Sequence, residues 1–259
     1  MSALVLVRDE GPVRWLTLNR PDVRNALSGA LVTALTDELQ AAATSSARCV
    51  ALTGAGSVFS AGADLKALEA MQSASYEENL ADSQRLAALF KTIAIHPMPV
   101  VAAVNGHAIA GGAGLAIACD AAFVARGAKI GFTEVRIGFV PAIILNFLLR
   151  TAGEKVLRDL CLTGRLVSGE EAATLGLVNE AVEPEALAAR VADFAAEIAK
   201  TSPNAVARTK HLFLELRSRP LDDGLALAAE ANARARATGD CREGIAAFLQ
   251  KRKPNWNEE

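Results

Sequence analysis

Residues 99–120 read PVVAAVNGHAIAGGAGLAIACD, and this stretch governs the interpretation of the rest of the chain. Its β-branched run at 100–104 predicts a buried strand, followed by a turn at 105–106 and a small-residue helix to Cys119. The first amides of a helix have no intrahelical partner, so the helix start can hold an anion, or an oxygen that becomes anionic in a reaction. The alternative is that the glycines at 111, 112 and 114 only let two backbones pack closely.

The composition predicts one large domain, or one domain with an extension, because 259 residues with 51% hydrophobic content can bury a sizeable core. The formal net charge of −2 without a basic stripe argues against nucleic acid and against an anionic membrane as partners. The four cysteines and three histidines show neither disulfide nor metal spacing, so no metal site is expected. No signal sequence or membrane-length apolar run is apparent, and we expect a cytoplasmic protein with reduced thiols.

Strand and helix patterns alternate along the chain up to about residue 200. After that point only helical patterns follow, at 203–217, 221–237 and 240–251. The predicted fold class is therefore α/β, with a core over residues 1–200 and a helical region over residues 201–259. Because no low-complexity linker separates the two parts, we expect the terminal helices to pack on the core or on a neighbouring subunit.

A second loop resembles the one at residues 110–113. Ser60, Ala61, Gly62, Ala63 and Asp64 also follow a predicted strand and precede a predicted helix. Each loop can present one backbone amide, and two amides that converge on one oxygen form an oxyanion hole. Competing interpretations lack their motifs, because the chain has no G-x-S-x-G elbow around the serine, no complete dinucleotide fingerprint and no P-loop lysine.

Five motifs, the first of them in two parts, together resemble the crotonase (enoyl-CoA hydratase/isomerase) superfamily and span nearly the whole chain. They are NRPD at 19–22, NAL at 25–27, FSAGADL at 59–65, NGHA at 105–108 with the following glycines, TEVRIG at 133–138, and the segment from Glu243 to Pro254. The resemblance implies a crotonase-like ββα spiral core with a C-terminal helical oligomerisation region that forms a homotrimer or homohexamer. It also implies an acyl-CoA thioester as substrate, with coenzyme A as part of that substrate and no separate cofactor.

The resemblance also assigns roles to individual residues. The amides of Ala63 and Gly111 would hold the thioester oxygen and stabilise an enolate-like transition state. Lys251 matches a position that reaches the CoA phosphates, sometimes from a neighbouring subunit. The remaining matches would line the CoA-binding cleft: Arg24, Ala26, Leu27, Ala61, Asp64 and Leu65.

The acid–base position departs from the pattern of the family hydratases, which usually carry two glutamates around one water. Glu134 matches the second of them, whereas position 114, where the first would fall, is a glycine. A buried glutamate in an apolar pocket would have a raised pKa suited to proton transfer. The bulky residues at 143–145 are expected to reshape the acyl pocket, and Asn146 is expected to face solvent.

The reaction expected from this resemblance is addition of water to a 2-enoyl-CoA, in fatty acid or branched acyl-CoA metabolism. The segment after Pro141, which lacks a run of glycines, resembles a hydratase subgroup. The single glutamate resembles the isomerase pattern instead, in which one carboxylate converts a 3-enoyl-CoA to a 2-enoyl-CoA. A non-catalytic acyl-CoA-binding or scaffold role is the second alternative, and an RNA-binding role is disfavoured because residues 29–45 contain no Lys or Arg.

Overall fold

The computed structural model describes residues 3–256, and its larger sheet has six strands in the order β1-β2-β3-β5-β7-β10. The first two strands are antiparallel and all other neighbours in this sheet are parallel. The strands are β1 (Val5–Glu10), β2 (Val13–Leu18), β3 (Cys49–Gly54), β5 (Val100–Val104), β7 (Ala121–Ala125) and β10 (Glu180–Val182).

A smaller sheet has four strands in the order β4-β6-β8-β9. The first three are parallel to one another, whereas β9 is antiparallel to β8. The chain enters the larger sheet and then the smaller one three times, as β3 then β4, β5 then β6, and β7 then β8, and a helical segment follows each pair. This ββα spiral confirms the predicted fold class. The strands are β4 (Val58–Ser60), β6 (His107–Ile109), β8 (Lys129–Gly131) and β9 (Val167–Ser168).

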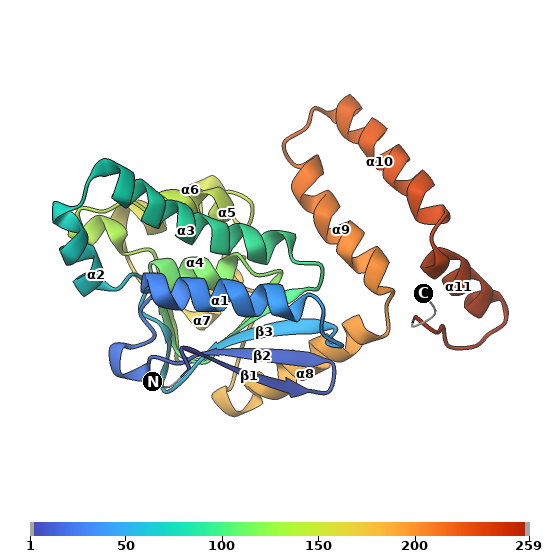
Figure 1. The fold of residues 1–259 in the computed structure, drawn as a ribbon, viewed down its shortest axis with the longest axis horizontal. Coiled ribbons are helices and arrows are strands. Elements are labelled where there is room, and N and C mark those ends of the chain that lie inside the picture. The colour runs from blue at the N-terminus through green and yellow to red at the C-terminus, as the bar shows by residue number, and fades with distance from the viewer. Residues whose placement is uncertain (1–2, 257–259) are drawn as a thin grey trace.

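Helices cover both faces of the larger sheet. Helices α1, α3 and α4 lie on one face and α8 lies on the other (Figure 1). Ser28 caps α1 by accepting a hydrogen bond from the Leu31 amide, and the leucines at 31, 35 and 39 are fully buried. The core helices are α1 (Gly29–Ala42), α2 (Leu65–Ala70), α3 (Tyr76–Ile95), α4 (Gly111–Ile117), α5 (Ala142–Leu148), α6 (Glu154–Thr163), α7 (Gly169–Thr174) and α8 (Leu187–Ala199).

Strand β5 lies in the middle of the core and is buried on both faces. The side chains at 100, 102 and 104 belong to the hydrophobic cluster under α1, α3 and α4. Those at 101 and 103 belong to a second cluster under α8. A central parallel strand covered by helices on both sides needs apolar residues at every position, which explains the uninterrupted apolar run.

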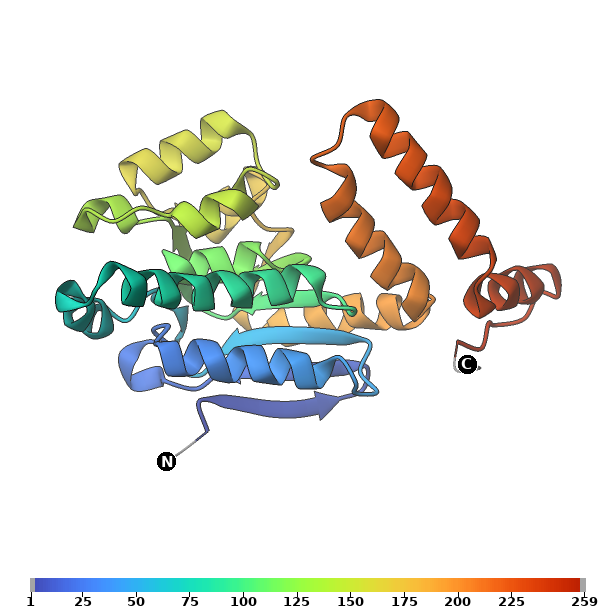
Figure 2. The same cartoon turned by 45° about the horizontal axis from the view of Figure 1, so that its top comes forward.

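The last three helices form a C-terminal arm, residues 203–249, that projects away from the sheets (Figures 1 and 2). The buried Lys210 docks the arm on the core, because its Nζ donates hydrogen bonds to the Ile93 carbonyl at 2.9 Å and to Asp120 Oδ2 at 2.6 Å. Several large apolar side chains of the arm remain mostly exposed, including Phe213, Leu221 and Phe248. The helices are α9 (Pro203–Leu216), α10 (Leu221–Arg236) and α11 (Gly239–Leu249). The proposed division at residue 200 stays a prediction, and its outermost residues, 1–2 and 257–259, lie outside the described part.

The structure adds one strand to the stretch at 99–120. The sequence predicts a strand, a turn and a helix there, whereas the structure inserts β6 between the turn and α4. The last strand of the larger sheet, β10, contains only residues 180–182. Within residues 3–256, no helix is long and apolar enough to cross a membrane.

Candidate active site

Three loops meet at one edge of the smaller sheet. Strands β4, β6 and β8 are neighbours and run parallel, so their carboxyl ends lie at the same edge. Ala63 follows the first of these strands, Gly111 the second and Glu134 the third. The topology therefore brings together three groups that are spread over 71 positions of the sequence, from residue 63 to residue 134. Crevices at the carboxyl ends of parallel strands are the usual ligand sites of α/β folds.

The backbone around Ala63 leaves its amide without a partner. Ala63 forms an isolated parallel bridge with Leu27, in which the Leu27 amide donates to the Gly62 carbonyl at 2.7 Å and the Asp64 amide donates to the Leu27 carbonyl at 3.4 Å. In such a bridge the N–H of the central residue points to the opposite side. Within residues 3–256, the Ala63 amide donates to no protein group.

The amide of Gly111 is the first of helix α4 and has no intrahelical acceptor. The preceding Ala110 has φ +50° and ψ −122°, a conformation that side-chain-bearing residues rarely adopt and that costs on the order of 1–3 kcal/mol. The two loops are in close contact, because a Cβ built on Gly111 would lie 3.9 Å from the Ala63 nitrogen, and one built on Gly62 would lie 3.1 Å from the Gly111 nitrogen. The structure thus brings both predicted amides side by side.

Glu134 begins a short 3-10 helix, η3 (Glu134–Ile137), and its side chain is buried, with 7% of the residue exposed. Its Oε2 atom is buried without a hydrogen-bond partner in the described part of the chain. Burial raises the pKa of Glu134, because desolvation penalises the charged form. Burial, together with the charge of the nearby Glu134, raises the pKa of the Cys161 thiol to about 11. A buried carboxylate oxygen without a hydrogen-bond partner destabilises the fold. Ionisable groups perturbed in this way cluster at functional sites, so Glu134 is a candidate for one.

The place of a second carboxylate is filled by an apolar side chain. Gly114 lies in α4, three residues after Gly111, and is buried. A Cβ built on Gly114 would lie 2.5 Å from Cγ1 and 2.7 Å from Cδ1 of Ile144, which belongs to α5. Ile144 therefore occupies the space of any side chain at position 114, and this position supplies no carboxylate.

We expect Gly114→Glu to lower the free energy of unfolding by about 1–3 kcal/mol, because the new side chain overpacks against Ile144. Urea unfolding measures this loss. The control is Gly127→Glu, since a Cβ there meets nothing within 4 Å. Adding Ile144→Ala should make the double variant more stable than the sum of the two single losses predicts. Strict additivity would contradict the steric conflict.

Most of the predicted CoA-cleft residues lie together around the Ala63 loop. The Ala61 amide donates to the Arg24 carbonyl at 2.9 Å, and the Ala26–Leu27 segment pairs with Gly62–Asp64. Arg24 is exposed with φ +53°, and Leu65, at the start of α2, is 62% exposed. Asp64 caps α2, because its Oδ1 accepts hydrogen bonds from the amides at 66 and 67. Whether these residues contact CoA stays a prediction.

Lys251 is the one predicted site residue that the structure does not bring to this place. It is exposed and lies two residues after α11, a helix on the opposite side of the molecule from α2 (Figure 1). Within one chain it therefore lies far from the three loops.

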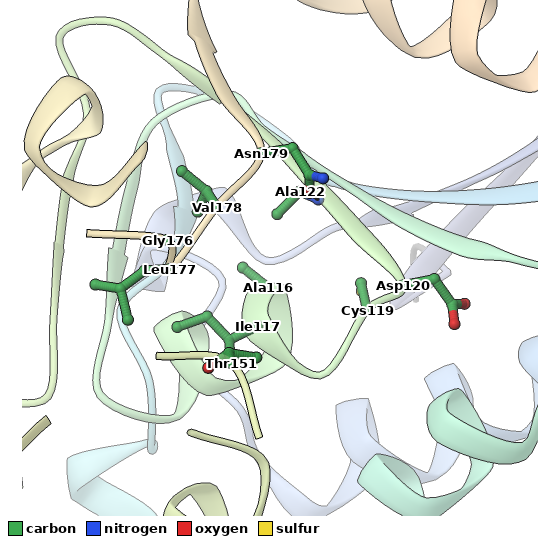
Figure 3. A pocket seen from close by; sticks show the side chains of 10 residues that line it. All are labelled: Ala116, Ile117, Cys119, Asp120, Ala122, Thr151, Gly176, Leu177, Val178 and Asn179. Atoms are coloured by element: carbon green, nitrogen blue, oxygen red, sulfur yellow. Dashed lines mark hydrogen bonds between the residues drawn. The ribbon is translucent and has the colours of Figure 1, made fainter. Parts of the chain in front are cut away.

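The cavity drawn in Figure 3 is separate from this site. It has a volume of about 160 Å³ and lies at the C-terminal end of α4, whereas Gly111 begins that helix. Its polar side chains are engaged elsewhere, because Asp120 pairs with Lys210 and the Asn179 Oδ1 accepts a hydrogen bond from the Ala122 amide at 2.8 Å. We assign it no role in the chemistry.

Two residues near the site were not singled out by sequence reasoning. Ile144 was expected only to reshape the acyl pocket, and Arg20 was noted only as part of the NRPD motif.

Asn146 is exposed, as expected. Ser60 is not an exposed nucleophile, because it is fully buried and its hydroxyl donates to the Asn25 carbonyl at 2.9 Å. No cluster of three or more His, Cys, Asp or Glu residues suited to a metal occurs in residues 3–256.

Comparison with known proteins identifies the class. The family model "Enoyl-CoA hydratase/isomerase" matches residues 8–259. The chain is 46% identical to a Thermus thermophilus protein with a provisional enoyl-CoA hydratase name, over 96% of this chain and 98% of that protein. It is 34% identical to the 2,3-dehydroadipyl-CoA hydratase of Escherichia coli, over 99% of both chains. A crystal structure of a Mycobacterium smegmatis enoyl-CoA hydratase superposes with a TM-score of 0.92 at 34% identity, over 99% of this chain and 100% of that one.

These matches span the sheets, the three loops and the C-terminal arm. The chain belongs to the enoyl-CoA hydratase/isomerase family, within the crotonase superfamily.

Proposed function

We propose that the protein hydrates a 2-enoyl-CoA thioester. The observation that carries this proposal is the buried, unpartnered Oε2 of Glu134 at the same sheet edge as two backbone amides that donate to no group in the described chain. The hydratase names of the relatives support the same reaction. CoA belongs to the substrate, and the proposed chemistry needs no separate cofactor.

The proposed reaction uses one carboxylate twice. The Glu134 carboxylate removes a proton from water while the water oxygen bonds to the β-carbon of the substrate. The electrons of the double bond move to the thioester oxygen, which accepts hydrogen bonds from the Ala63 and Gly111 amides. Protonated Glu134 then gives its proton to the α-carbon, which yields a 3-hydroxyacyl-CoA and restores the carboxylate.

A second candidate is isomerisation of a 3-enoyl-CoA. The Gly114–Ile144 contact favours it, because this wall offers no second carboxylate to hold a water. Glu134 would then remove a proton from the α-carbon and return it to the γ-carbon, while the same two amides hold the enolate oxygen. No water is consumed in this reaction.

One pair of incubations separates these candidates. Crotonyl-CoA tests hydration, and 3-hexenoyl-CoA tests migration of the double bond, each followed separately by chromatography of the products. We expect crotonyl-CoA to become the 3-hydroxy thioester. Double-bond migration without hydration would assign the isomerase reaction, and a lack of both would favour a non-catalytic, acyl-CoA-binding role.

The pH dependence of kcat/KM should follow the ionisation of Glu134. Hydration starts from the carboxylate, so kcat/KM should fall on the acid side with an apparent pKa above the value of about 4.3 for an unperturbed glutamate. The free energy of unfolding should change with pH in the opposite direction to kcat/KM. Because the pKa of Glu134 is higher in the folded protein than in the unfolded chain, Glu134 stabilises the fold fully below its unfolded pKa. This stabilisation is lost as the pH rises through its folded pKa.

Glu134→Gln should therefore gain stability relative to the original chain as the pH rises from about 4 to neutrality. Urea unfolding of both proteins across this range measures the difference. A stability difference that does not change with pH would contradict a raised pKa at Glu134.

We also propose that the C-terminal arm packs against further copies of the chain in a homotrimer or homohexamer. Its exposed apolar side chains support this assembly, because they would otherwise face water. A neighbouring subunit would then bring its own Lys251 to the CoA phosphates, which the lysine of the same chain does not approach.

The four cysteines are free thiols, which supports a reducing compartment, proposed to be the cytoplasm.

A further inference from the structure

We propose that Arg20 is a positioning residue that aims the Ala63 amide at the thioester oxygen, an inference that rests on the proposed function. Arg20 lies in the loop after β2 and donates two hydrogen bonds from one nitrogen, Nη1. One goes to the Ala26 carbonyl at 2.7 Å and the other to Asp64 Oδ2 at 3.0 Å. Ala26 directly precedes Leu27, and Asp64 directly follows Ala63. The guanidinium thus ties together both segments of the Leu27–Ala63 bridge.

The bridge needs such a tie because only one of its two hydrogen bonds is short, the one from the Leu27 amide to the Gly62 carbonyl at 2.7 Å. It consists of a single residue pair, and the hydrogen bond from the Asp64 amide to the Leu27 carbonyl is long, at 3.4 Å. Hydrogen bonds of this length contribute little to rigidity. An oxyanion donor must be held to within about 0.5 Å of its productive position. Arg20 bonds to the residues that flank the bridge, Ala26 and Asp64, whereas the other side-chain link between the two segments, from the Ser60 hydroxyl to the Asn25 carbonyl at 2.9 Å, lies further from Ala63.

Arg20 is itself anchored at its backbone. The Arg20 amide donates to Asn25 Oδ1 at 2.9 Å, and the Asn25 amide donates to the Arg20 carbonyl at 2.9 Å. Asn25 is fully buried, and its Nδ2 donates to the carbonyls of Ala55 at 3.0 Å and Val58 at 2.7 Å. These bonds hold Arg24 and Asn25 at φ +53° and +54°, where side-chain-bearing residues are rare. The guanidinium therefore extends from a fixed point.

The ion pair is better suited to positioning than to stabilising the fold. The side chains of Arg20 and Asp64 are 22% and 16% exposed, so water can still reach the Asp64 carboxylate when the guanidinium is removed. The hydrogen bond from Arg20 lowers the pKa of Asp64. Asp64 uses its other oxygen, Oδ1, to cap α2, so both of its oxygens are engaged. Removing the guanidinium should loosen the loop without unfolding the domain.

The test compares Arg20→Met, Arg20→Lys and the control Arg14→Met. Arg14 forms a comparable pair with Asp9 at 2.7 Å on strands β1 and β2. Turnover of crotonyl-CoA gives kcat and KM. Binding of a 4-(dimethylamino)cinnamoyl-CoA chromophore reports polarisation of the thioester carbonyl, because hydrogen bonds to that oxygen shift its absorption to the red. Thermal unfolding of each variant confirms folding.

We expect Arg20→Met to lower kcat by at least about 10-fold, approaching the 10²–10³-fold loss typical of one missing oxyanion donor. KM should stay within about twofold, and the red shift of the bound chromophore should shrink. Arg20→Lys should recover part of both, since its ammonium can still donate to the Ala26 carbonyl, and Arg14→Met should change neither.

An unchanged kcat and red shift in Arg20→Met would overturn the inference while leaving the proposed function intact. A rise in KM without a change in kcat would also overturn the inference, because it would show that Arg20 contacts the substrate. If the original chain neither turns over the substrate nor shifts the chromophore, the proposed function fails, and the inference fails with it.

Discussion

Glu134→Gln should lower kcat on crotonyl-CoA by about 10²–10⁴-fold while the enzyme still binds CoA thioesters. The amide has nearly the shape of the carboxylate but cannot take a proton from water, and general acid–base catalysis contributes about this factor. Position 114 offers no neighbouring carboxylate to take over, because Ile144 fills that space. Steady-state kinetics give kcat, and calorimetric titration with a non-reacting acyl-CoA gives the affinity.

The matched control for this change is Glu154→Gln. Glu154 is an exposed glutamate that pairs with Arg158 on the surface of α6, so its loss should leave kcat unaltered. Because Glu134 is buried with a raised pKa, its replacement should not destabilise the fold at neutral pH. Full activity of Glu134→Gln would refute the proposed mechanism.

Ala63→Pro should lower kcat by about 10²–10³-fold, the usual cost of losing one oxyanion-hole donor. Proline removes the N–H, and no backbone hydrogen bond is lost with it, because the bridge to Leu27 uses the Gly62 carbonyl and the Asp64 amide. The preceding residue is a glycine at φ +84°, which tolerates the restriction that proline imposes better than other residues would. The measurement is kcat on crotonyl-CoA.

Ala63→Gly is the control for this variant, because it keeps the amide and removes only a methyl group. It should keep most of the activity. Unfolding curves of both variants separate a lost donor from a lost fold. If a folded Ala63→Pro protein turns over substrate at the original rate, the Ala63 amide is not an oxyanion donor.

The sequence predicts the larger sheet and its helices well because these elements carry long, regular patterns. Helix α6 at 154–163 and strand β7 at 121–125 both lie in the part of the chain where strand and helix patterns alternate. The smaller sheet was largely missed. Its strands β4, β6 and β9 have only two or three residues, too few for an alternating pattern to be visible.

The ββα units leave no fixed-period repeat in the sequence because their lengths differ. The larger-sheet strands of successive ββα units begin at Cys49, Val100 and Ala121, so the units differ greatly in length. The first unit is long because α2 and α3 follow its two strands. The spiral is therefore regular in space but not in sequence.

The structure places the two candidate amides and the glutamate at one sheet edge, where the motifs suggested a common site. The roles of Arg20 and Ile144 depend on contacts between distant segments, from 20 to 64 and from 114 to 144. No local pattern records such contacts. Lys251 is a residue that the motif match assigned to the site but that the fold of a single chain does not bring there, because it follows α11.

The most direct test of the central claim is exchange of the α-protons of butyryl-CoA in deuterium oxide, followed by mass spectrometry. The claim is that Glu134 transfers protons at the α-carbon while the Ala63 and Gly111 amides stabilise the enolate oxygen. Exchange needs both functions, and it needs neither hydration nor double-bond migration. Glu134 would remove the α-proton, exchange it with solvent and return a deuteron. We predict deuterium incorporation with the original chain and none above background with Glu134→Gln. Equal incorporation in both proteins, or none in an original chain that binds butyryl-CoA, would contradict it.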